Sequence, residues 1–194
     1  MNKAVFLDRD GTVNEEVGYL SDLKQLKVIP GAGAAIRRLN EAGFKVVLVT
    51  NQSGVARGYF SESFVLDTHA LLEQRLRNEG ARFDGIYYCP HHPTKGNSRY
   101  TTECDCRKPG TGMIDRAARD LNVDVKKSYV VGDKWSDVEL GQRAGAHTIL
   151  VRSGITPDRE GNLRPGHLLD PEFIARTITE AVEWILQRGT RDHR

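Results

Sequence analysis

Asp8 and Asp10 are the two residues with the clearest chemical use, because they flank a single residue directly after the apolar run Val5-Phe6-Leu7. One carboxylate of such a pair can attack a phosphorus atom and become an aspartyl phosphate. The other can protonate the leaving oxygen and later take a proton from water. Neighbouring carboxylates repel each other unless a cation lies between them, and magnesium prefers oxygen ligands of this kind. The spacing favours phosphoryl chemistry, and a plain polar turn is the alternative.

The segment before Asp8 is typical of a buried strand. Val5, Phe6 and Leu7 follow one another without polar alternation, which suits a strand covered on both faces in a parallel sheet. In open α/β sheets, ligands bind beyond the carboxyl ends of the strands, and Gly11 lets the chain turn away so that both aspartates face that crevice. Four more strands are predicted: residues 44–49, 84–88, 129–131 and 147–151.

Polar residues follow the predicted strand at residues 44–49. Their hydroxyl and amide groups suit phosphate oxygens, although a capping loop of turn residues is about equally compatible with the pattern. These residues are Thr50, Asn51, Gln52 and Ser53, followed by Gly54. The irregular stretch at residues 14–19 is expected to form a loop beside the end of the first strand, where a substrate could touch it.

Charged residues further along the chain would reach the same edge of the sheet. Lys108 would bring a compact ammonium close to the aspartates, and Arg107 offers a planar fork for a second anionic group. Asp133 directly follows a predicted strand and would complete the metal site. Ser136 is predicted to cap the next helix, with Asp137 in its first turn, where a carboxylate could serve only to stabilise the helix.

Apolar residues at helical spacing predict helices between these strands. The helices begin after Pro30-Gly31, at Ser61, after Gly112, near Ser136 and at Pro171. The second, residues 61–76, carries His69, which we interpret as a surface or boundary residue because a lone helical histidine is seldom a ligand. The fifth, residues 171–186, follows a long predicted loop at residues 153–171. Residues 189–194 are expected to be a disordered tail.

All three cysteines fall in one stretch: Cys89, Cys104 and Cys106. With either His91 or His92 they provide three thiolates and one imidazole, a tetrahedral zinc set that leaves no position for water and is therefore structural. The loop between them contains almost no apolar residue and would depend on the metal for its fold. We expect a zinc loop at residues 89–106 rather than a disulfide framework, and chance clustering of free thiols is the alternative.

Length and composition indicate one mildly basic globular domain. A chain of 194 residues with a net charge of +2 and a pI near 8.4 can hold one well-buried core, and we expect residues 1–188 to form a single domain. Small anionic substrates suit this charge balance, and no basic run argues for nucleic acid as a partner. The longest aliphatic run, residues 46–49, is too short to span a membrane, so we expect a soluble, cytoplasmic protein.

The signals at residues 8–12, Thr50, Lys108 and Asp133 resemble, in this order, the motifs of the haloacid dehalogenase superfamily. The resemblance implies a three-layer α/β fold, doubly wound around a mainly parallel sheet of strand order 5-4-1-2-3. The spaces between the motifs are too short for the cap domain of larger members. The roles that it implies are Asp8 as nucleophile, Asp10 as general acid and base, Thr50 and Lys108 as phosphate ligands, and Asp8, Asp10, Asp133 and Lys134 as magnesium ligands.

The zinc loop is similar to those of the D-glycero-D-manno-heptose 1,7-bisphosphate 7-phosphatases and the histidinol-phosphate phosphatases. The strings at residues 51–58, 87–93 and 132–134 resemble the heptose enzymes more closely, and the long spacing between Cys-x-His and Cys-x-Cys also favours them. In that family the position of His91 binds zinc together with the three cysteines. The substrate would be lined, by family position, by Glu16, Val17, Gly18, Tyr19, Thr50, Asn51, Gln52, Ser53, Arg107, Lys108 and Lys134.

The resemblance implies removal of the 7-phosphate through an aspartyl phosphate, which gives heptose 1-phosphate for nucleotide-activated heptose and lipopolysaccharide synthesis. The implied cofactors are Mg²⁺ and a structural Zn²⁺, the implied partner is a phosphorylated sugar, and the protein would be a monomer. Three alternatives remain at this point: a histidinol-phosphate phosphatase, a polynucleotide 3′-phosphatase and a zinc-stabilised module without enzymatic activity. A module without enzymatic activity would not explain why the aspartates and Lys108 occur in the order found in the superfamily.

Overall fold

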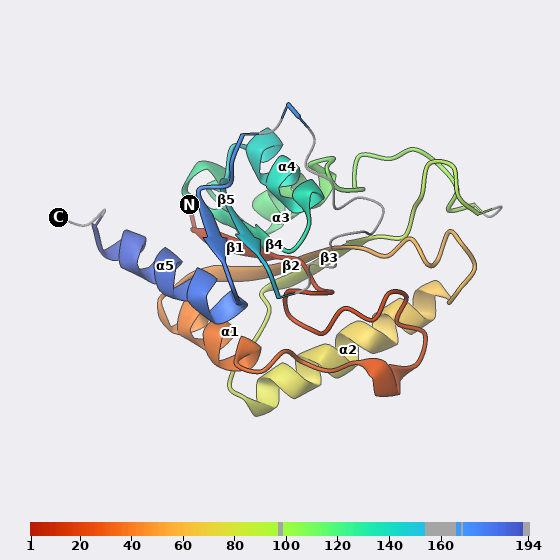
Figure 1. Cartoon of the computed structure of the whole chain (residues 1–194), viewed down its shortest axis with the longest axis horizontal. Coiled ribbons are helices and arrows are strands. Elements are labelled where there is room, and N and C mark those ends of the chain that lie inside the picture. Colours follow the sequence, from red (N-terminus) through yellow and green to blue (C-terminus); the bar gives the residue numbers. More distant parts are fainter. Residues whose placement is uncertain (97–98, 154–165, 168, 192–194) are drawn as a thin grey trace.

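The computed structural model describes residues 1–96, 99–153, 166–167 and 169–191, and within them a single parallel sheet crosses the molecule (Figure 1). Its strands are β1 (Ala4–Leu7), β2 (Lys45–Asn51), β3 (Gly85–Cys89), β4 (Tyr129–Gly132), β5 (His147–Val151) and β6 (Phe173–Ala175). They lie in the order β3-β2-β1-β4-β5-β6, and all neighbouring pairs are parallel. The predicted order of the first five strands is confirmed, and β6 extends the sheet beside β5.

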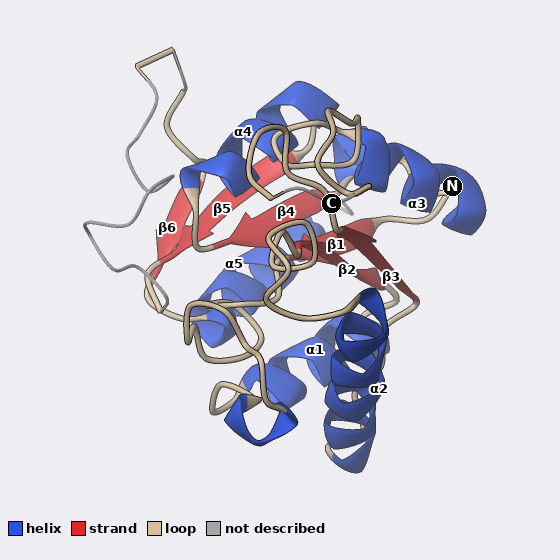
Figure 2. Ribbon diagram, turned by 90° about the vertical axis from the view of Figure 1, so that its right-hand side faces the viewer, coloured by secondary structure: helices blue, strands red, loops and turns tan. Residues whose placement is uncertain are grey.

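Helices cover both faces of this sheet. They are α1 (Ala32–Glu41), α2 (Glu62–Asn78), α3 (Gly112–Leu121), α4 (Trp135–Ala144) and α5 (Ile178–Arg191), with short 3₁₀ turns at Leu23–Gln25 and Val125–Lys127. Figure 2 shows α1, α2 and α5 on one face, and α3 and α4 on the other, which confirms the predicted three layers. None of the described helices combines the length and apolar character that crossing a bilayer requires.

β1 divides its side chains between two apolar cores. Val5 and Leu7 pack with the core under α1, α2 and α5, whereas Ala4 and Phe6 pack with the core under α3 and α4. Successive side chains of a strand point to opposite faces, so an uninterrupted apolar run fills both cores. Burial of each large apolar side chain contributes about 1.5–3 kcal/mol. This explains why the segment occupies the centre of the sheet.

The register of the sheet brings the ends of three strands to one edge. Leu7 pairs with Leu48 of β2 and with Val131 of β4. The backbone N–H of Asp8 donates to the carbonyl oxygen of Val131 (2.9 Å), which continues the pairing beyond β1. Asp8 and Asp133 therefore leave adjacent strands at the carboxyl edge, where α/β folds bind their ligands.

The prediction of a helix at residues 171–186 is wrong for its first part. Phe173–Ala175 is extended and pairs with β5, and α5 begins only at Ile178. The hydroxyl oxygen of Thr177 accepts a hydrogen bond from the backbone N–H of Glu180 (3.3 Å), as a residue at a helix start does. Apolar spacing alone missed this signal, because Phe173 and Ile174 fit a helical pattern as well as a short strand.

The prediction that Ser136 caps the following helix is also wrong. α4 begins at Trp135, and Lys134 occupies the N-cap position. A carboxylate oxygen of Asp137 accepts a hydrogen bond from the backbone N–H of Lys134 (3.1 Å), which stabilises the first turn. The capping hydrogen bond expected from Ser136 is therefore supplied by Asp137, whose stabilising effect on the first turn is as expected.

The prediction of a C-terminal tail from residue 189 is wrong for its first three residues. α5 continues to Arg191, so residues 189–191 belong to the helix, and residues 192–194 lie outside the described residues. Residues 154–165 and 168 of the predicted loop also lie outside them. At the start of α2, by contrast, the prediction is confirmed, because the side chain of Ser61 accepts a hydrogen bond from the backbone N–H of Phe64 (3.2 Å).

Two leucines on α2 provide a matched test of this packing. Leu72 is fully buried in the core under α1, α2 and α5, whereas Leu66 is 52% exposed. We expect Leu72→Ala to lower the free energy of unfolding by about 2–5 kcal/mol, because it removes buried apolar contacts and leaves a cavity. Leu66→Ala removes the same atoms from the surface and should change it by about 0.5 kcal/mol or less. Urea unfolding of both variants measures this, and equal losses would contradict the packing described here.

Candidate active site

Three buried carboxylates converge at the carboxyl edge of the sheet. Asp8 follows β1, Asp133 follows β4, and Asp137 lies in the first turn of α4. One oxygen of each lies within 4.8 Å of the others, and all three residues are almost completely buried. Such close approach of acidic groups is unfavourable unless positive charge lies between them.

Lys108 supplies part of that positive charge. Its Nζ lies 2.8 Å from Oδ1 of Asp8 and 2.6 Å from Oδ1 of Asp137, and it donates a hydrogen bond to the carbonyl oxygen of Val49. Burial alone would lower the pKa of Lys108, but the charges of Asp137 and Asp8 outweigh it and raise the pKa above its ordinary value. The side chain is therefore a charged ammonium.

Asn51 fixes the backbone at Lys108. Its Oδ1 accepts from the backbone N–H of Lys108 (3.0 Å), and its Nδ2 donates to the carbonyl oxygen of the same residue (3.3 Å). Both contacts join residues 57 positions apart in the chain. The last residue of β2 thus determines where the ammonium enters the site.

Asp133 has two buried carboxylate oxygens without a hydrogen-bond partner among the described residues. Burial, with the charges of Asp8 and Asp137, raises the pKa of Asp133 to about 8 despite the neighbouring charge of Lys134. A hard divalent cation binds oxygen atoms of this kind. The donor set therefore fits magnesium at the three clustered carboxylates, to which the carboxylate of Asp10 does not belong.

Asp10 is surrounded by hydrogen-bond donors instead. The guanidinium of Arg9 binds both of its oxygens at 2.8–3.1 Å. Nδ2 of Asn14 donates to Oδ1 (2.9 Å), and Nε2 of Gln52 donates to Oδ2 (3.0 Å). Burial would raise the pKa of Asp10, but the charge of Arg9 and the hydrogen bond from Asn14 outweigh it, and the pKa lies below its ordinary value.

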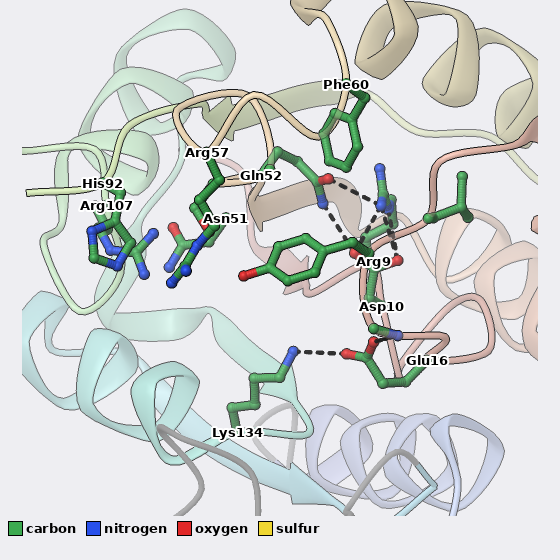
Figure 3. Close-up of a pocket in the computed structure, with 15 residues that line it drawn as sticks. Arg9, Asp10, Glu16, Asn51, Gln52, Arg57, Phe60, His92, Arg107 and Lys134 are labelled. Carbon is green, nitrogen blue, oxygen red and sulfur yellow. Dashed lines mark hydrogen bonds and ion pairs between the residues drawn. The ribbon is translucent and has the colours of Figure 1, made fainter. Parts of the chain in front are cut away.

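A cavity of about 700 Å³ opens beside Asp10. Figure 3 shows Asp10 near one end, while nitrogen-bearing groups gather toward the other end. These groups are Arg57, Arg107 and His92. Lys134 and Glu16 form an ion pair of 3.1 Å along the wall. A cavity with this charge distribution can hold a ligand that carries two anionic groups some distance apart.

Three thiols and one imidazole meet between β3 and α3: Cys89, His91, Cys104 and Cys106. Four of the distances between their sulfur and Nδ1 atoms are 3.4–3.7 Å, close to the edge of about 3.8 Å expected for a tetrahedron of sulfur atoms around zinc. Hydrogen bonds from Cys89 and His91 lower the pKa of Cys106 to about 5, while the pKa of Cys89 is raised. The donors therefore fit a zinc ion.

His92 lies outside this group, although it is adjacent to His91. Its Nδ1 accepts hydrogen bonds from the backbone N–H groups of Thr94 (3.1 Å) and Lys95 (2.9 Å), and its side chain lines the cavity. Of the two histidines that the sequence left open, the geometry brings His91 to the thiols.

Glu62 attaches the cysteine loop to the rest of the molecule. One of its carboxylate oxygens accepts from the hydroxyl of Tyr100 in the loop (2.6 Å), and the other accepts from the hydroxyl of Tyr88 in β3 (2.9 Å). The hydrogen bond from Tyr100 is the largest reason why the pKa of Glu62 is lowered. This glutamate at the start of α2 therefore joins three elements next to the cavity.

Comparison with known proteins identifies this arrangement. A haloacid dehalogenase-like hydrolase model matches residues 5–68, and a HAD-hydrolase-like model matches residues 105–181. A D-glycero-beta-D-manno-heptose-1,7-bisphosphate 7-phosphatase from Pasteurella multocida is 44% identical over 171 residues, which cover 88% of this chain and 92% of that protein. The chain belongs to the heptose-1,7-bisphosphate 7-phosphatase family.

Further members of the heptose-1,7-bisphosphate 7-phosphatase family agree with this assignment. The 7-phosphatase from Thermosynechococcus vestitus is 44% identical over 188 residues, with 94% of each chain covered. The crystal structure of D,D-heptose 1,7-bisphosphate phosphatase from B. bronchiseptica, complexed with magnesium and phosphate, superposes with a TM-score of 0.82 at 34% identity. That superposition covers 96% of this chain and 99% of the other.

Most residues expected to contact the substrate of a heptose bisphosphate phosphatase line the cavity. They are Glu16, Gly18, Tyr19, Asn51, Gln52, Ser53, Arg107 and Lys134. Thr50 and Lys108 are buried outside its wall, where Oγ1 of Thr50 accepts a hydrogen bond from Gln52 (2.9 Å), and Val17 is exposed outside it. Sequence reasoning did not single out Arg57 or Phe60, which also line the cavity; the string at residues 51–58 contained the signal for Arg57.

The interpretation of His69 as a surface or boundary residue is wrong. Its exposed fraction is 4%, and its Nε2 lies 3.4 Å from Nη1 of Arg9. Burial and the charge of Arg9 lower the pKa of His69 to about 3, so the ring is neutral at neutral pH. Helical spacing could not reveal this position, because it gives no sign that Arg9 is itself buried and turned toward α2.

The buried neutral ring predicts a pH dependence of stability. In the unfolded chain His69 regains its ordinary pKa of 6.5, so between pH 6.5 and about 3 it binds a proton only after unfolding. Folding stability from this residue is therefore lost as the pH falls through that window, by about 1.4 kcal/mol per pH unit at most. His69→Gln cannot take up this proton, and we expect its free energy of unfolding to fall less steeply between pH 7 and pH 5.

Urea unfolding of the two proteins at several pH values measures the difference. Other titrating groups contribute equally to both proteins, so the comparison isolates His69. Parallel pH dependences would contradict the low pKa of the buried ring.

Proposed function

We propose that this protein hydrolyses the 7-phosphate of D-glycero-D-manno-heptose 1,7-bisphosphate and leaves heptose 1-phosphate. The observation that carries the proposal is Asp8, held by the Lys108 ammonium beside two further carboxylates in a member of this enzyme family. A cavity with the proton-transfer candidate Asp10 at one end and cationic groups at the other supports a substrate with two phosphates.

The proposed reaction has two steps. A carboxylate oxygen of Asp8 forms a bond to the phosphorus of the 7-phosphate, and the bond from phosphorus to the sugar oxygen breaks. Asp10, an anion in the resting protein, first takes up a proton and then gives it to that sugar oxygen. In the second step Asp10 takes a proton from water, the water oxygen attacks the phosphorus of the aspartyl phosphate, and the carboxylate of Asp8 leaves. Lys108 stabilises the negative phosphoryl oxygens in both steps.

Magnesium is part of this proposal. Asp8 and Asp133 would hold it together with Asp137, and family position adds Asp10 and the backbone carbonyl of Lys134. The ion would supply positive charge against the phosphoryl oxygens. The orphaned oxygens of Asp133 and the magnesium in the B. bronchiseptica structure support this assignment.

The remote end of the cavity would bind the 1-phosphate. Arg107 and Arg57 offer planar forks of N–H donors, which suit phosphate oxygens, and His92 lies beside them. Lys134 adds a charge between the two ends, where its Nζ already contacts Glu16. A substrate with a single phosphate would offer no second set of phosphate oxygens to Arg107 and Arg57.

We also propose that the four cysteine-loop donors bind a structural zinc ion, and that one copy of the chain, with residues 1–188 as a single domain, acts as a monomer in the cytoplasm. The near-tetrahedral spacing of the three thiols and His91 supports the zinc.

Phosphate release by the purified protein in the presence of Mg²⁺ tests the substrate. We expect strong preference for one anomer of heptose 1,7-bisphosphate over histidinol phosphate and a 3′-phosphorylated oligonucleotide. Asp8→Asn should abolish turnover, because an amide does not attack the phosphorus, and Asp10→Asn should lower it by about 10²–10⁴, the usual worth of a positioned proton donor.

Thermal unfolding of both variants is the control, since loss of activity counts only in folded protein. Full activity in Asp8→Asn would overturn the nucleophile. Preference for histidinol phosphate or the oligonucleotide would overturn the substrate and leave the two-step chemistry in place.

The zinc proposal has its own test. Cys106→Ser removes one thiolate, so we expect the purified variant to lose bound zinc and to unfold at a lower temperature. His92→Asn changes the neighbouring imidazole outside the cluster and should keep its zinc. Elemental analysis of both proteins decides the matter: a normal zinc content in Cys106→Ser contradicts the ligand set, and zinc loss in His92→Asn contradicts the choice of His91.

A further inference from the structure

Arg9 is buried, with an exposed fraction of 2%, although its side chain carries a full positive charge. A buried guanidinium is costly unless its N–H groups find acceptors. Nε and Nη2 donate to the oxygens of Asp10, and Nη2 also donates to Oε1 of Gln52 (3.1 Å). The proposed chemistry gives Arg9 no direct role, so its contacts require an explanation of their own.

The remaining nitrogen of Arg9 faces His69. Nη1 lies 3.4 Å from Nε2 of that histidine, which belongs to α2 and is buried. The two residues are 60 positions apart in the chain. Helix α2 thus reaches across the face of the sheet to touch the arginine that holds the proposed general acid.

The geometry fixes the chemical form of the histidine. Nη1 of Arg9 can only donate, so Nε2 of His69 must be the unprotonated ring nitrogen, and the proton must be on Nδ1. A protonated ring would place two cations against each other in a buried site. The pKa of about 3 for this side chain agrees with a neutral ring.

The ring has a defined place on α2. It meets the ring of Tyr88 edge to face, with centroids 5.5 Å apart. This contact fixes the ring beside β3 and leaves its Nε2 toward Arg9. A residue that served only to fill space between α2 and the sheet would need no acceptor at this point.

We infer that His69 is a positioning residue for Asp10 and acts through Arg9. The histidine accepts from Nη1 and sets the plane of the guanidinium, and the guanidinium in turn sets the plane of the Asp10 carboxylate through its two-point contact. Asn14 and Gln52 each donate to one oxygen of Asp10, and Arg9 is the residue that donates to both oxygens. The inference rests on the proposed function, in which Asp10 transfers protons.

Loss of this contact should affect the chemical step rather than substrate binding. A small misplacement of a proton-transfer group costs up to about 10²-fold in rate, and we expect about a tenfold fall in kcat when the acceptor is removed. KM should change little, because His69 does not line the cavity. A residue with a purely structural role would lower stability without this selective loss.

Two substitutions separate these possibilities. His69→Phe keeps an aromatic ring against Tyr88 but removes the acceptor, whereas His69→Gln keeps an acceptor oxygen at about the position of Nε2. Steady-state phosphate release from heptose 1,7-bisphosphate gives kcat and KM for each protein. We expect kcat to fall in the phenylalanine variant and to be restored to within about twofold in the glutamine variant, with KM unchanged in both.

Equal kcat in the phenylalanine variant and the unsubstituted protein would overturn the inference, as would an equal loss in both variants. A measurement that needs neither substitution nor substrate covers the case in which a variant does not fold. Long-range ¹H–¹⁵N correlation spectra of the unsubstituted protein identify the protonated ring nitrogen of His69. We expect Nδ1–H with Nε2 free, and Nε2–H would contradict the contact with Arg9. If the protein releases no phosphate from the sugar, the proposed function fails while this spectrum still reports on the contact.

Discussion

One ammonium group, that of Lys108, faces three buried carboxylates, and this imbalance of charge is the constraint on which the site depends. The sheet makes the imbalance unavoidable, because β1 and β4 are neighbours and release Asp8 and Asp133 side by side. Lys108 arrives from a distant part of the chain, and Asn51 binds its backbone on both sides. A single positive charge cannot neutralise three negative ones. A proton on Asp133, whose pKa is raised to about 8, or a further cation relieves this repulsion, and a bound cation would also attract the phosphoryl group toward Asp8.

The cavity also separates charged groups, over a longer distance than the carboxylate cluster. Asp10 is held as an anion by donors on several sides, and the ion pair of Lys134 with Glu16 lies along the cavity wall. The cationic side chains at the other end, Arg57 and Arg107, offer a place for negative charge away from Asp10. Because the wall on the cationic side comes from the segment around the cysteine cluster, the metal-binding loop contributes to recognition through its neighbours rather than through its own metal ligands.

The sequence was most informative where a pattern is compatible with only one kind of structure. Apolar segments indicated five strands, the family resemblance supplied their order, and the aspartates directly after β1 and β4 followed from the strand positions. Two of the failures have a common cause, since each depended on a partner far away in the chain. Phe173–Ala175 forms a strand because it pairs with the free edge of β5. His69 is buried where its ring nitrogen accepts a hydrogen bond from Arg9. The residue spacing within one segment gives no information on such distant partners. Clustered cysteines differ, because the residues that bind the metal together are visible in the sequence itself.

Glu62 holds Tyr100 of the cysteine loop and Tyr88 of β3 at once, so the loop is fastened to the body of the protein at a second point besides its donor cluster. A wall fixed in this way does not have to swing aside to admit a ligand. With this wall held in place, the slowest event of each cycle would be bond breaking or the departure of phosphate rather than a motion of the cysteine loop. Ligands would then be selected by how well they fit a preformed cavity. Water could reach the covalent intermediate without a conformational change.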